Sequence, residues 1–152
     1  MESIAWLLNF GDGQLAAVGK RELLHLVPQP ELFEVPRTPR HCSRVLIWQH
    51  RVVPVWDILA WIKPGSRAKD AGLVAVVGYQ SRRRQTPQFG AMVLAEPPSR
   101  IGVTDAQACE LSREQSAWGE IAISCFRHEE KPVAVLDLPL MFSGAFAADA
   151  ST

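Results

Sequence analysis

The chain has 152 residues, of which 47% are hydrophobic and 21% are charged, and its formal net charge is +0. These values are typical of a folded globular domain and exclude a largely disordered protein. Because 16 basic and 16 acidic residues cancel, the chain lacks the positive field that nonspecific nucleic-acid binding needs, so we expect no nucleic-acid partner.

Short apolar runs rich in Val, Leu and Ile, separated by turn residues, predict a mainly β protein. The first two runs flank Gly11-Asp12-Gly13, which predicts a tight hairpin because Asp-Gly supplies the positive φ that such a turn requires. Residues 20–27 are expected to form a strand or a helical turn. The other expected strands cover residues 4–10, 14–18, 44–48, 51–56, 72–79, 89–96, 99–103, 118–126 and 131–136.

Two segments interrupt this pattern. A polar, turn-prone stretch near residues 63–71 is expected to separate two halves of a single domain that covers residues 1–143. Residues 144–152, which are small and weakly charged, are expected to form a flexible C-terminal tail.

The N-terminal segment and the cysteines indicate a cytoplasmic protein. Glu2 stands where a signal peptide has Lys or Arg, and the apolar stretches of the chain fall short of the roughly 18 residues of a membrane span. Cys42, Cys109 and Cys125 are far apart in the sequence, which indicates neither a disulfide framework nor a zinc site. We therefore expect no direct membrane insertion.

A repeat relates the two halves of the chain. Residues 51–59 and 131–139 each contain a cation, a mostly apolar run, an aspartate and a second short apolar segment. We expect Asp57 and Asp137 to end buried strands and to cap the helical turns that follow, because a carboxylate accepts the free N–H groups at a helix start. Pro139 suits such a first turn.

The sequence contains little that suggests catalysis. Its histidines lie in unrelated contexts, and neighbouring side chains such as His41 and Cys42 point to opposite faces of a strand, which disfavours a shared metal or a catalytic dyad. We expect no enzyme, no cofactor and no metal. A small hydrolase using Cys42 or Cys109 stays open as an alternative, and it requires a histidine within hydrogen-bond reach.

A run of three arginines, Arg82, Arg83 and Arg84, lies between two expected strands and predicts a hairpin tip. Such a tip is either a solvated loop that prevents strand edges from pairing or an anion or partner site. The second interpretation leads to another alternative, a small-ligand- or nucleotide-binding β-barrel, which requires a concave pocket.

The central segment of the chain resembles the CheW-like family. Members of that family have the pattern V-P-x-x-P followed by G-V-I-N-L-R-G-x-x-x-P-V-x-D-L, and this chain has similar runs at residues 35–39 and 44–58. Residues 22–24, 89–93 and 133–141 are similar to the family's E-I-I, G-L-x-V and L-D-x-x-x-L motifs, respectively. The resemblance extends from Ile4 to Phe142.

The resemblance implies a fold of two five-stranded, SH3-like β-barrels packed around a shared hydrophobic core, with a few short helices. It also implies a non-enzymatic adaptor that joins chemoreceptors to a CheA-like histidine kinase in cytoplasmic signalling arrays. Barrel edges would bind the regulatory domain of the kinase, and a groove between the barrels would bind the receptor tip.

This chain departs from the family's N-L-R-G motif. Gln49 stands where the family has an Arg that helps to hold the receptor, and His50 adds a side chain where the family has a turn Gly. We therefore expect weak binding to ordinary chemoreceptor tips and an accessory role in the control of type IV pili or surface motility. The expected partner-binding residues are Glu22, Arg44, Trp48, Gln49, His50 and Arg51.

Overall fold

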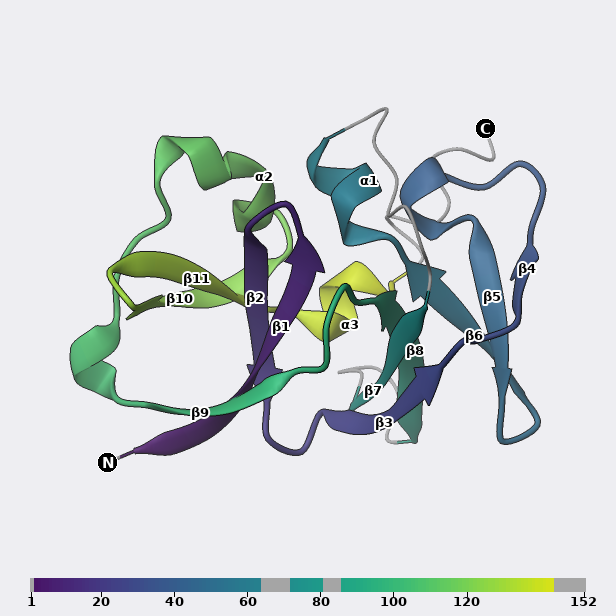
Figure 1. Ribbon diagram of the computed structural model, residues 1–152, viewed down its shortest axis with the longest axis horizontal. Coiled ribbons are helices and arrows are strands. Elements are labelled where there is room, and N and C mark those ends of the chain that lie inside the picture. The colour runs from purple at the N-terminus through teal and green to yellow at the C-terminus, as the bar shows by residue number, and fades with distance from the viewer. Residues whose placement is uncertain (1, 64–71, 81–85, 144–152) are drawn as a thin grey trace.

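The structure is a computed structural model that describes residues 2–63, 72–80 and 86–143 (Figure 1). Three predicted segments lie outside the described residues: the C-terminal tail at 144–152, the arginine run at 82–84 and residues 64–71 of the predicted break.

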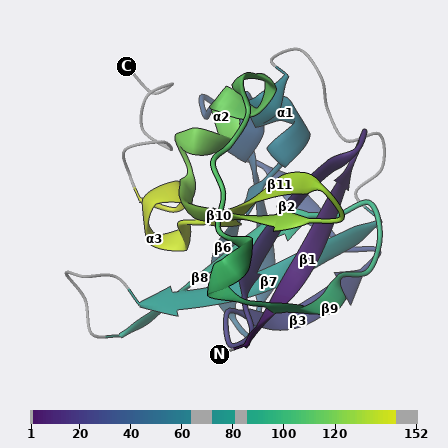
Figure 2. The ribbon, with the colours of Figure 1, turned by 90° about the vertical axis from the view of Figure 1, so that its left-hand side faces the viewer.

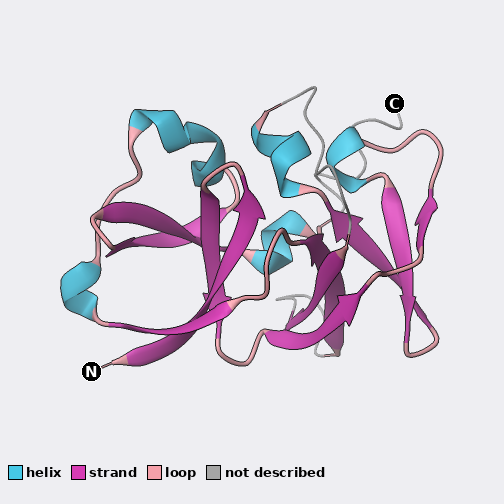
Figure 3. Ribbon diagram, viewed as in Figure 1, coloured by secondary structure: helices cyan, strands magenta, loops and turns pink. Residues whose placement is uncertain are grey.

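Strands dominate the described chain, as the sequence predicts (Figure 3). The strands are β1 (Ser3–Gly11), β2 (Gln14–Gly19), β3 (Leu23–Pro28), β4 (Leu32–Glu34), β5 (Arg44–Trp48), β6 (Arg51–Trp56), β7 (Leu73–Gln80), β8 (Pro87–Val93), β9 (Ser99–Val103), β10 (Ala122–His128) and β11 (Lys131–Leu136). The helical turns are η1 (Arg40–Cys42), α1 (Ile58–Ile62), η2 (Asp105–Gln107), η3 (Arg113–Gln115), α2 (Ser116–Gly119) and α3 (Leu138–Met141).

The strands form two curled sheets, which confirms the predicted pair of barrels. One sheet has five strands in the order β10-β11-β2-β1-β9, and it faces the viewer in Figure 2. The other has six strands in the order β3-β7-β8-β6-β5-β4. The expected five strands become six here because the three-residue strand β4 pairs with the outer edge of β5.

The hydrophobic core has a shared part and two separate parts. The shared cluster takes buried side chains from both sheets, including Trp56 of β6, Leu136 of β11 and Met141 of α3, and α3 lies between the sheets in Figure 1. Each sheet also encloses a cluster of its own. At the junction, the Trp61 indole N–H donates to the Ala117 carbonyl at 3.4 Å, which links α1 to α2. These are the contacts of two barrels around a common core.

The sequence repeat corresponds to two matching units, β5–β6–α1 and β10–β11–α3. In each unit the aspartate is the N-cap of the helix, with Asp57 accepting from the Ala60 N–H at 3.3 Å and Asp137 accepting from the Leu140 N–H at 3.2 Å. The last strand of each unit then pairs in parallel with a strand outside the unit, β6 with β8 and β11 with β2. The two units therefore share their connections as well as their sequence pattern.

Among the described residues, no helix has the length and apolar character needed to span a membrane.

Candidate functional site

The predicted partner-binding residues centre on the β5–β6 hairpin. Trp48 pairs with Arg51 at the last rung, so Gln49 and His50 form a two-residue turn, with φ values of 48° and 63°. Positive φ at both central residues is the type I′ geometry that suits the twist of a hairpin. Neither residue is a glycine, so the turn retains this geometry at some cost in backbone strain.

Three side chains near this turn form an aromatic and cationic cluster. The Trp48 ring lies 5.5 Å from the Phe89 ring of β8, and the guanidinium carbon of Arg51 lies 4.6 Å from the centroid of the same Phe89 ring. The His25 ring of β3 lies 6.4 Å from the Trp48 ring. Because Trp48 and Phe89 pack against the interior of the six-stranded sheet, the cluster closes one end of that barrel.

The opposite face of the hairpin is apolar and exposed. Ile47 pairs with Val52, and their side chains are 53% and 68% exposed because Leu46 and Val53, the neighbouring pair, point inward. Phe33, which is 45% exposed, continues the row onto β4. Residues that are directly opposite in antiparallel strands point to the same side, so these strands share what we call the outer apolar face, made of Phe33, Val45, Ile47, Val52 and Pro54.

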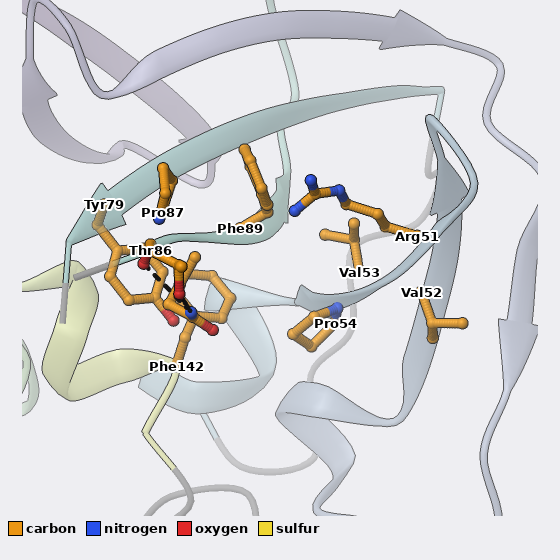
Figure 4. Close-up of a pocket in the computed structure, with 10 residues that line it drawn as sticks. Arg51, Val52, Val53, Pro54, Tyr79, Thr86, Pro87, Phe89 and Phe142 are labelled. Atoms are coloured by element: carbon orange, nitrogen blue, oxygen red, sulfur yellow. Dashed lines mark hydrogen bonds between the residues drawn. The ribbon is translucent and has the colours of Figure 1, made fainter. Parts of the chain in front are cut away.

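A cleft opens beside the hairpin, between β6 and β8. The two strands pair in parallel at Val55 and Trp56, and toward their N-terminal ends they separate to leave a cavity of about 560 Å³ (Figure 4). The base of the cleft includes Phe142, which follows α3 and stacks on Tyr79 at 5.9 Å. Gly90 permits this approach, since a Cβ there would lie 2.5 Å from the Phe142 ring. The cleft therefore draws on both halves of the chain.

The comparisons with known proteins identify a fold. No protein-family model matches this sequence, and no curated protein matches it. The structure is similar to the crystal structure of the scaffolding protein TtCheW from Thermoanaerobacter tengcongensis, with a TM-score of 0.73 over 94% of each chain and 12% sequence identity. The chain has the CheW fold. The architecture implied by the sequence resemblance is thus confirmed.

Within this CheW fold, two of the predicted binding residues lie apart from the hairpin turn. Arg44 is at the far end of β5, where its Nη2 lies 3.7 Å from Oδ2 of the buried Asp57. Glu22 is in the β2–β3 connection, where its Oε1 accepts from the Gly19 N–H at 2.7 Å and its carbonyl accepts from the Gly78 N–H at 2.8 Å. Burial raises the pKa of Glu22, and the bond from Gly19 opposes that shift. Both residues have structural contacts here.

Several surface residues of the site were not predicted from the sequence. Ile47, Val52 and Phe33 belong to the outer apolar face, and Tyr79 and Phe142 belong to the cleft. The alternation on either side of the predicted turn contains the signal for the first two, because a buried Leu46 and Val53 place Ile47 and Val52 on the outside. Tyr79 and Phe142 have no such signal, since they meet only through the tertiary fold.

The geometry disfavours the hydrolase alternative. Burial raises the pKa of the Cys42 thiol to about 11, and among the described residues no hydrogen bond joins a cysteine to a histidine. The His41 ring packs 4.6 Å from Trp56 and 4.9 Å from Trp61, and burial lowers the pKa of His41. The described part of the chain also contains no group of three or more His, Cys, Asp or Glu side chains suited to a metal ion.

Proposed function

We propose that this protein is a non-enzymatic scaffold of a bacterial chemosensory pathway, where it couples a CheA-type histidine kinase to a chemoreceptor or to another signalling protein. The outer apolar face carries the proposal, because its exposed side chains Phe33, Ile47 and Val52 lie in one apolar row with the half-buried Val45 and Pro54, and such a patch is typical of a protein interface. The CheW fold supports it, since the similar solved structure is described as that of a scaffolding protein.

Comparison of the two repeat units shows which apolar residues of the hairpin are needed for folding. In both units the inward pair of the hairpin is apolar and buried. The outward pair is Ile47 and Val52 in the first unit, but the equivalent pair 80 residues later is Arg127 and Pro132. The second hairpin therefore forms with an arginine at the position of Ile47. The exposed isoleucine has no evident folding role, which favours a role in binding.

The regulatory domain of the kinase is the partner that we propose for the outer apolar face. Burying one Ile side chain contributes roughly 1.5–3 kcal/mol, so Ile47→Arg should weaken the complex by about tenfold to a hundredfold. Isothermal titration of the purified protein with the kinase regulatory domain measures the change. Because the contact buries apolar surface, the wild-type affinity should persist at raised ionic strength.

Ile123 provides a matched control for this experiment. It is 66% exposed, against 53% for Ile47, and it lies on β10 in the other sheet. Ile123→Arg should leave kinase binding unchanged, and the unfolding free energy of both variants should stay within about 0.5 kcal/mol of the wild type. Equal loss of affinity in both variants, or none in Ile47→Arg, would show that the outer apolar face does not bind the kinase.

The cleft between β6 and β8 is the place that we propose for the receptor or accessory partner. It adjoins Arg51 and Phe89 at the hairpin cluster, and it includes Phe142 from the other half of the chain. Because Gln49 replaces a charged donor of the family motif, we propose a partner other than an ordinary chemoreceptor tip, in a system that controls type IV pili or surface motility. Such a scaffold acts in the cytoplasm, where the kinase is located.

A small-ligand-binding barrel remains the second candidate, and the cleft favours it as well. A volume of about 560 Å³ lies within the range of small-molecule sites. Capture of the tagged protein's partners from the native cytoplasm distinguishes the two functions. Recovery of a CheA-type kinase supports the scaffold, whereas a small bound molecule without any protein partner supports the ligand-binding barrel. A complex that dissociates at raised salt would point instead to the arginines at residues 82–84.

A further inference from the structure

Cys109 and Cys125 are neighbours across two antiparallel segments. Ala108 forms an isolated antiparallel bridge with Phe126, so the next pair along is Cys109 with Cys125. The Cys109 N–H donates to the Cys125 carbonyl at 3.2 Å, and the two sulfur atoms lie 3.1 Å apart. Directly opposed residues of antiparallel segments have Cα atoms about 4.5–5.5 Å apart, which lies within the range that a disulfide accepts.

The pair joins a covering segment to the edge of a sheet. β10 is the outermost strand of the five-stranded sheet, and residues 104–111 run along its free edge. The Gln107 amide also donates to the Arg127 carbonyl at 3.0 Å, so one side-chain hydrogen bond and one backbone hydrogen bond hold this segment in place. A covalent link between the sulfur atoms would add to these contacts without a change of register.

We propose that Cys109 and Cys125 form a reversible disulfide that locks residues 104–111 onto the edge of β10. The oxidant is a low-molecular-weight disulfide such as glutathione disulfide. One cysteine thiolate attacks it to form a mixed disulfide and releases one glutathione thiolate. The second cysteine then attacks the protein-bound sulfur and releases the other glutathione. The protein loses two hydrogen atoms, and one glutathione disulfide is reduced to two glutathiones.

The third cysteine serves as the internal control. Cys42 is buried, with 9% of its surface exposed, so a disulfide in solution has poor access to it. Cys109 and Cys125 are both partly exposed. Burial, followed by the hydrogen bond to Cys109, raises the pKa of Cys125, which favours Cys109 as the thiol that attacks first.

The experiment equilibrates the purified, fully reduced chain with mixtures of glutathione and glutathione disulfide. The protein is then denatured in the presence of N-ethylmaleimide, which alkylates free thiols, and mass spectrometry counts the alkylated cysteines. We expect the alkylated cysteines to fall from three to one, with a peptide that links Cys109 to Cys125. Cys42→Ser should retain the link, and Cys109→Ser should lose it. Three free thiols at the highest glutathione disulfide, or stable glutathione adducts without an internal link, would overturn the proposal.

Amide hydrogen exchange tests whether the link acts as a lock. Closing a loop between residues 109 and 125 suppresses local opening, so the amides of residues 104–111 should exchange at least about tenfold more slowly in the oxidised protein. Reduction with dithiothreitol should restore the faster rate. A disulfide that forms but leaves these exchange rates unchanged would refute the locking role, since the segment would then be held equally well in both states.

Discussion

Asp57 and Asp137 occupy the same position in the two repeat units. Truncating each one to alanine therefore shows how its surroundings change its contribution to the unfolding free energy. Each carboxylate accepts a backbone N–H at the start of a helix, and loss of such a cap costs about 1 kcal/mol. For Asp137→Ala the expected loss of unfolding free energy is therefore about 1 kcal/mol.

Asp57→Ala should cost about 3 kcal/mol. Asp57 is 3% exposed, and its Oδ2 lies 3.7 Å from Nη2 of Arg44, whose side chain is 14% exposed. Truncation leaves a largely buried cation without this carboxylate, which adds about 2 kcal/mol to the loss of the cap. The figure is below the roughly 3–5 kcal/mol of a fully buried pair because Arg44 keeps some contact with water.

Equilibrium unfolding in urea, followed by tryptophan fluorescence, measures both losses. Combining Asp57→Ala with Arg44→Met should cost less than the sum of the single changes, by about 1–2 kcal/mol, because the two side chains interact directly. Equal losses for Asp57→Ala and Asp137→Ala, or full additivity with Arg44→Met, would refute this reasoning. A variant that stays fully stable but no longer binds its partner would make that aspartate a binding residue.

Three further predictions concern the hairpin and the cleft. His50→Gly should raise the unfolding free energy by about 1 kcal/mol, because His50 has a φ of 63°, and Glu130→Gly should do the same at a φ of 67° in the equivalent turn. Gly90→Ala should lower the unfolding free energy by about 2 kcal/mol, because the new Cβ meets the Phe142 ring. Urea unfolding measures the changes in all three of these variants. Gln49→Arg with His50→Gly should tighten binding to a chemoreceptor tip by roughly tenfold to a hundredfold in a titration.

Local signals were sufficient to predict most strands, while two segments depended on longer-range contacts. The expected strand at 118–126 begins at Ala122, because residues 116–119 form α2 and the buried Trp118 donates its indole N–H to the Gln14 side chain. The pair Ser112 and Gln115, which forms a capping box, was the available signal for a helical turn there. β4 had no comparable signal, because its three residues are ordered by pairing with β5.

The candidate site shows the same division between local and tertiary information. The turn at Gln49 and His50 follows from its place between two strands, and the repeat leads directly to both aspartates. The cleft depends on where β6 and β8 stop pairing, and the contact of Cys109 with Cys125 depends on a single bridge beside β10. Neither arrangement is encoded in sequence spacing, because both arise between segments that are joined only by the folded core.

The hairpin tip keeps a two-residue turn with positive φ although neither of its central residues is a glycine. Gln49 and His50 adopt the left-handed φ values of a type I′ turn, and Glu129 and Glu130 adopt nearly the same values in the second unit. Both hairpins therefore tolerate side chains where glycine would be the least strained residue. If Gln49 presents fewer donors than the arginine of the family motif at a turn of this kind, the proposed scaffold should keep its fold and stability while its affinity for an ordinary chemoreceptor tip falls.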